Sequence, residues 1–67
     1  MVEVEFDCGF RWMADQLEKY VGPRKFVLHN RIGGEGWDVR PARGGYANAI
    51  VRFDDPKMAT FMQLKLA

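Results

Sequence analysis

Apolar and acidic residues alternate along the first eight positions of the chain. Val2, Val4 and Phe6 are separated by acidic residues, and this period of two predicts a half-buried strand with one acidic, solvated side. Cys8 continues the apolar positions. We therefore expect a buried thiol that behaves as a small hydrophobic group.

From residue 10 the apolar spacing changes to three and four. The positions that follow this helical period are Phe10, Met13, Ala14, Leu17, Tyr20 and Val21. Gly22 and Pro23 end the pattern, because glycine suits the left-handed position after a helix and proline prevents its continuation. The spacing therefore predicts a helix over 10–21. At 100° per residue Trp12 lies nearly opposite the middle of the stripe, so its indole should point away from the core.

Three further strands are expected in the glycine-rich middle of the chain. They cover 25–30, 37–40 and 46–53. The glycine-rich segments 33–36 and 42–45 between them are expected to be turns, because glycine tolerates positive φ. The first glycine cluster lacks the helix and the Lys-Ser/Thr ending of a phosphate loop, which favours turn chemistry over a phosphate cradle. Short strands divided by such turns are typical of an antiparallel meander.

The last segment begins with a helix-start signature. Asp54-Asp55-Pro56 places a capping carboxylate before a proline in the first turn. A helix is expected to follow, although Met62, Leu64 and Leu66 also alternate and 61–66 could end as a strand. We predict one α+β domain over 1–67, with the order β-α-β-β-β-α. Its sheet would have four mainly antiparallel strands, in an order left open, with two helices on one face.

Composition argues against several functional classes. The 67 residues are 48% hydrophobic and 13% aromatic, enough for a small core but scarcely for a deep substrate pocket. One cysteine and one histidine can form neither an internal disulfide nor a zinc site. No apolar run approaches a membrane span and the acidic N-terminus is unlike a signal peptide. We therefore expect a cytoplasmic protein without metal, cofactor or membrane contact.

Catalytic constellations are also missing from the sequence. There is no serine for a Ser-His-Asp triad, and Cys8 and His29 should face opposite sides of the sheet. Capping accounts for the Asp54-Asp55 pair. We therefore predict a protein that is not an enzyme and has no catalytic residues.

Charge is distributed unevenly along the chain. Residues 1–18 hold five carboxylates and one arginine, whereas residues 19–53 hold seven cations and two carboxylates. The basic part combines arginines with aromatic residues, and arginine favours planar contacts with phosphate or carboxylate while aromatic rings stack on bases. Together with Trp12, the candidate partner-binding residues are Arg31, Trp37, Arg40, Arg43 and Tyr46.

The C-terminal run from Val51 to Leu66 resembles the ending of many small tailed-bacteriophage proteins. These carry an aromatic strand, an acidic or proline turn, and then a stretch similar to A-T-x-F-x-L-K, which reads here as ATFMQLK. The resemblance covers about a quarter of the chain. It implies a virus-encoded accessory protein acting on a host factor in the host cytoplasm, or a minor virion component.

Three functions fit these features. Our first hypothesis is a protein-binding module that modulates a host protein, with Trp12 as an anchor. The alternatives are nucleic-acid binding through the loops that carry Arg31, Arg40 and Arg43 and a structural role through sheet-edge pairing or self-association.

Overall fold

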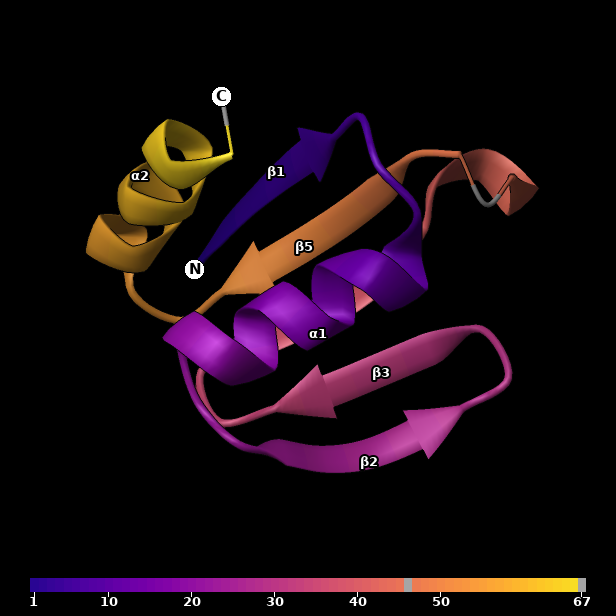
Figure 1. Cartoon of the computed structure of the whole chain (residues 1–67), viewed down its shortest axis with the longest axis horizontal. Helices are drawn as coiled ribbons and strands as arrows, with labels where there is room; N and C mark the ends of the chain where they lie inside the picture. Colours follow the sequence, from indigo (N-terminus) through magenta and orange to yellow (C-terminus); the bar gives the residue numbers. More distant parts are fainter. Residues whose placement is uncertain (46, 67) are drawn as a thin grey trace.

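Five strands and two helices make up the computed structural model, which describes residues 1–45 and 47–66 (Figure 1). In chain order the elements are β1 (Val2–Phe6), α1 (Phe10–Tyr20), β2 (Arg24–Leu28), β3 (Arg31–Gly34), β4 (Trp37–Pro41), the short 3-10 turn η1 (Ala42–Gly44), β5 (Ala49–Phe53) and α2 (Pro56–Lys65). The α+β class and the antiparallel sheet are confirmed. The predicted count of four strands is wrong, because the order is β-α-β-β-β-β-α.

The strands lie in the order β1-β5-β4-β3-β2, and every neighbouring pair is antiparallel. Strands β2 to β5 therefore form a meander, as the turns predicted. The first strand of the chain joins this meander by pairing with β5, the last, with Val4 opposite Val51. The two edges of the sheet are thus β1 and β2.

The additional strand lies where the sequence predicted a turn. The chain reverses at His29 and Asn30, and Gly33 and Gly34 belong to β3 instead of to a loop. A Cβ on Gly33 would collide with the ring of Phe26, and a Cβ on Gly34 would collide with the indole of Trp37. These two glycines are therefore explained by the close approach of aromatic rings.

The turn between β3 and β4 consists of Glu35 and Gly36. Gly36 has φ +83°, which places it in the left-handed region that glycine adopts without steric cost. The predicted turn at 33–36 is therefore correct for its second half only.

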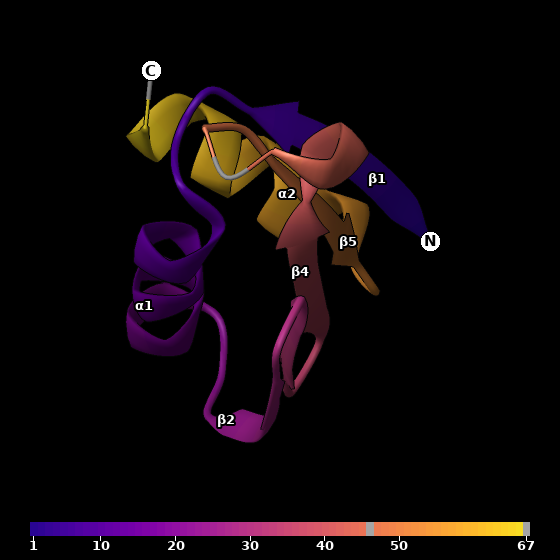
Figure 2. The same ribbon diagram turned by 90° about the vertical axis from the view of Figure 1, so that its right-hand side faces the viewer.

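Both helices pack on the same face of the sheet. Helix α1 lies against β3, β4 and β5, and α2 lies against β1 and β5. Figure 2 shows α1 as a separate layer on one side of the strands. One continuous core joins the two layers, and its buried members are Phe6, Phe10, Met13, Ala14, Leu17, Ile32, Trp37, Val39, Ala49, Val51, Phe53, Ala59 and Met62. The predicted stripe of α1 supplies four of these residues, at positions 10, 13, 14 and 17, and α2 supplies Ala59 and Met62.

One corner of the molecule is held by a buried indole. Trp37 is 3% exposed and its Nε1 donates a hydrogen bond of 2.8 Å to the carbonyl of Gly22, just after α1. Beside it, the amide of Glu35 donates to the carbonyl of Pro23 at 2.9 Å, and the amide of Asp54 donates to the carbonyl of Gly36 at 3.1 Å. The end of α1, the β3–β4 turn and the end of β5 are thereby joined.

Helix α2 begins as its signature predicted. Asp55 is the N-cap, and its carboxylate accepts a hydrogen bond of 2.9 Å from the amide of Lys57. The helix continues to Lys65, so the strand alternative for the end of the chain is wrong. Burial of Ala59 and Met62 on the sheet explains why the helical period prevails over the alternation.

We predict that Asp55→Ala lowers the free energy of unfolding by about 1 kcal/mol, because the first turn of α2 loses its side-chain acceptor. Urea denaturation followed by circular dichroism would measure the change. Asp54→Ala is the matched control, since it removes a neighbouring carboxylate that makes no capping hydrogen bond. Equal losses in the two variants would show that charge, and not the cap, is responsible.

Candidate functional site

Trp12 lies at the edge of a hollow on the helical side of the molecule. The hollow has a volume of about 370 Å³ and is lined by Gly9, Phe10, Arg11 and Trp12. Trp12 is 49% exposed, while Phe10, two positions earlier, is 1% exposed. The predicted orientation of Trp12 away from the core is confirmed.

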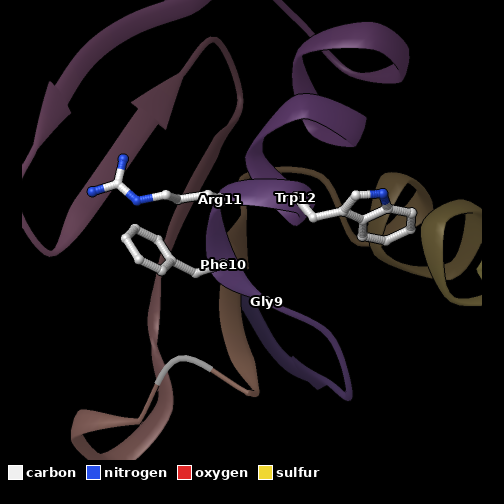
Figure 3. A pocket seen from close by; sticks show the side chains of 4 residues that line it. All are labelled: Gly9, Phe10, Arg11 and Trp12. Carbon is white, nitrogen blue, oxygen red and sulfur yellow. The ribbon is translucent and has the colours of Figure 1, made fainter.

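The side chains around this hollow point in different directions (Figure 3). Trp12 extends toward the side of α2, and Arg11 extends the opposite way, above Phe10. The Arg11 guanidinium carbon lies 5.2 Å from the centroid of the Phe10 ring, within the range of a cation–π contact. The start of α1 therefore presents an aromatic group and a cation on one short segment.

A second exposed aromatic group lies on the same side of the molecule, between the helices. The rings of Tyr20 and Phe61 pack edge to face, with centroids 6.3 Å apart, and Phe61 is 43% exposed. The ammonium groups of Lys19 and Lys65 lie 5.2 and 4.7 Å from the Tyr20 ring centroid. A hydrogen bond with Lys19, helped by the charges of both lysines, lowers the pKa of the Tyr20 hydroxyl.

The other face of the sheet is not covered by either helix of the described chain, and its side chains form two rows across the strands. From β1 to β2, the first row holds Glu3, Arg52, Asp38, Gly33 and Phe26. The second row holds Glu5, Ile50, Arg40, Arg31 and Leu28. The uncovered face is therefore acidic at the β1 edge, basic in the middle and apolar at the β2 edge.

The basic middle of this face contains a second hollow. It has a volume of about 270 Å³ and is lined by Arg31, Asp38, Arg40 and Arg52. The Nε of Arg31 donates to both carboxylate oxygens of Asp38, at 3.0 and 2.8 Å, and its Nη2 donates to Oδ2. This pairing raises the pKa of Arg31 and fixes the plane of its guanidinium group.

The β2 edge exposes three consecutive apolar residues. Phe26, Val27 and Leu28 are 38%, 52% and 55% exposed, and β3 is the one strand of the described residues with which β2 pairs. The ring of Phe26 lies 5.4 Å from the Arg31 guanidinium carbon. An apolar edge strand is a surface on which another extended chain can pair.

The structure brings together some of the residues that the sequence predicted as a site and separates others. Arg31 and Arg40 line the same hollow, whereas Arg43 lies in η1, exposed and with φ 51°. Trp37 is buried in the core and has no surface to offer a partner. Tyr46 lies outside the described residues.

Two residues that line this hollow, Asp38 and Arg52, are not among the predicted partner-binding residues, although Arg52 belongs to the basic part of the sequence. Arg52 is the one that strand alternation could have pointed to. It lies in β5 between Val51 and Phe53, both fully buried. The alternation of that strand would have placed Arg52 on the opposite face from the core. The missing information was which strands lie beside β5.

Cys8 follows β1 and lies partly buried, with its Sγ 3.7 Å from the Sδ of Met13. Burial, followed by the nearby charge of Asp7, raises the pKa of its thiol. Within residues 1–45 and 47–66, no three His, Cys, Asp or Glu side chains gather where they could hold a metal ion. None of the described helices is long and apolar enough to cross a membrane.

Comparison of the chain with protein-family models, with curated proteins and with solved structures found no match.

We predict that Cys8 reacts more slowly with iodoacetamide in the folded chain than in urea at about pH 8, because the raised pKa reduces the thiolate fraction. Mass spectrometry of timed samples would give both rates. Since the folded thiol holds its proton more strongly, this group favours the fold below its ordinary pKa. That contribution is lost as the pH rises through the folded value. A folded-state rate equal to or above the unfolded one would contradict the prediction.

Proposed function

We propose that this chain is a non-catalytic protein-binding domain and that the surface around Trp12 is its contact site. The observation that carries the proposal is an indole with half its surface exposed beside a hollow of about 370 Å³. Tryptophan is enriched among the residues that dominate binding energy at protein interfaces. Exposure of its apolar surface to water is unfavourable in free energy, and burial of that surface against a partner would be favourable.

The helix that carries Trp12 is firmly held. Its inward residues Phe10, Met13 and Leu17 are at most 1% exposed. The backbone under Trp12 is therefore anchored in the core, so that little conformational entropy is lost when a partner docks. A rigid support of this kind favours binding over a purely incidental exposure.

The chemistry of the hollow suggests what it accepts. The exposed indole of Trp12 suits an apolar side chain, and the Arg11 guanidinium suits a carboxylate. We therefore propose a partner segment in which an acidic residue lies next to an apolar one. The resemblance of the C-terminal run to phage proteins supports a partner from the bacterial host, which the domain would modulate.

Nucleic-acid binding is less favoured as the principal function. Two of its three predicted contacts, Arg31 and Arg40, share the uncovered face with Asp38, Glu3 and Glu5. Carboxylates along this face repel a chain of phosphates. Self-association would use a different surface, the exposed β2 edge. The molecular mass in solution distinguishes it from binding of another protein, because only self-association gives a mass above that of one chain.

We predict that Trp12→Ala lowers stability by about 1 kcal/mol or less, because half of the indole is already solvated, and abolishes capture of a protein partner. The measurement is a pull-down from bacterial lysate, with and without nuclease treatment, using the wild type and the variant, with bound proteins identified by mass spectrometry. A band that only the wild type enriches, and that binds it again as a purified protein, is the expected result.

Phe26→Ala is the matched control, because Phe26 is an exposed aromatic residue on the opposite face of the sheet. It should retain the partner. Loss of the partner in Phe26→Ala but not in Trp12→Ala would move the contact site to the β2 edge. Capture that disappears on nuclease treatment would replace the protein partner by nucleic acid.

A further inference from the structure

The hollow on the uncovered face carries more positive than negative charge. Three guanidinium groups and one carboxylate line it, from Arg31, Arg40, Arg52 and Asp38, which leaves a formal charge of +2 on its lining. The register explains this concentration: Asp38 lies opposite Arg52 across β4 and β5, and Arg40 is two residues further along β4. All four side chains therefore project from the same side of three adjacent strands.

Two of these arginines have hydrogen-bond donors to spare. No described residue offers Arg52 a carboxylate within ion-pair distance. Asp38 engages the Nε and Nη2 atoms of Arg31, so Nη1 is not used by that pair. Asp38 thus orients the guanidinium group of Arg31 and leaves its Nη1 donors available for another acceptor.

Arg40 forms a weak, exposed ion pair with Glu3. Its Nη1 lies 3.5 Å from a carboxylate oxygen of Glu3, and both side chains are nearly half exposed. Exposed pairs of this kind contribute little, and a more highly charged anion can displace them. Glu3 therefore holds Arg40 beside the hollow without neutralising it firmly.

From this geometry we infer that the hollow is a binding site for a phosphate monoester. A phosphate monoester carries close to two negative charges at neutral pH and three terminal oxygens, matching both the charge of the lining and its three guanidinium groups. A carboxylate has one charge and two oxygens, so it would leave one arginine unmatched. The volume, below the range of whole-ligand pockets, suits a single anionic group.

The surroundings of the hollow favour one phosphate over a chain of phosphates. On the β1 side it is bordered by Glu3 and Glu5, and on the β2 side by Phe26 and Leu28. A nucleic-acid strand crossing this face would place its next phosphates against carboxylates or apolar groups. The apolar side, in contrast, suits the organic part of a monoester such as an aryl phosphate.

The test is calorimetric titration of the wild type with inorganic phosphate and with phenyl phosphate, at constant ionic strength. Both should bind, and phenyl phosphate should bind more tightly if the organic group contacts Phe26. Arg52→Gln should weaken binding about tenfold or more, because it removes one charge-assisted contact. Glu3→Gln should strengthen binding, because Arg40 is then free of its competitor.

Arg11→Gln is the control, since it makes the same charge change at the hollow beside Trp12. It should leave phosphate affinity unchanged, and circular dichroism would verify that all variants are folded. Equal affinity of wild type and Arg52→Gln, or loss of affinity in Arg11→Gln, would overturn the site. Tighter binding of a single-stranded oligonucleotide that Arg52→Gln abolishes would overturn the choice of ligand. The site lies on the face away from the helices, so its failure would leave the Trp12 proposal standing.

Discussion

The buried indole of Trp37 is the constraint on which the arrangement of this small fold depends. It occupies the space above Gly34 that any side chain would fill, and its single polar atom is satisfied by the Gly22 carbonyl. A buried N–H without a partner would cost about 1–3 kcal/mol. The indole can therefore be buried at this place only because the Gly22 carbonyl accepts its hydrogen bond. Through this contact the end of α1 is fixed against the β3–β4 hairpin. The pleat of each strand then sets which side chains enter the core and which face solvent.

A consequence is that the molecule has two unlike sides. The side with the helices exposes aromatic groups, chiefly Trp12 and Phe61, on elements anchored in the core. The uncovered side of the sheet exposes mostly charged groups in an ordered gradient from acidic to basic, ending in the apolar edge of β2. Binding events on the two sides need not compete, because the sheet lies between them.

Much of this arrangement follows from local sequence patterns. The three-four spacing identified α1, the Asp-Pro signature identified the start of α2, and the same spacing set Trp12 outside the core. The sequence predicts a turn at Gly33 and Gly34, where the structure has strand β3. This difference could not be predicted, because a glycine that makes room for a neighbouring ring looks the same in sequence as a glycine in a turn. Here that reason is the approach of the Phe26 and Trp37 rings. Trp37 itself shares the strand parity of the buried Val39, which is a sequence signal for its burial. The meeting of Arg31, Arg40 and Arg52 depends on which strands are neighbours, and a single sequence does not encode that locally.

The pairing of β1 with β5 gives the two halves of the sheet different folding costs. Strands β2, β3 and β4 are joined by short turns, so little chain entropy is lost when they pair. Val4 and Val51 must meet across almost the whole chain, and long-range contacts of this kind slow folding. We expect the meander to assemble early and β1 to dock late. The β1 half would then also be the first to open in hydrogen exchange, exposing the edge of β5 while the corner around Trp37 stays closed.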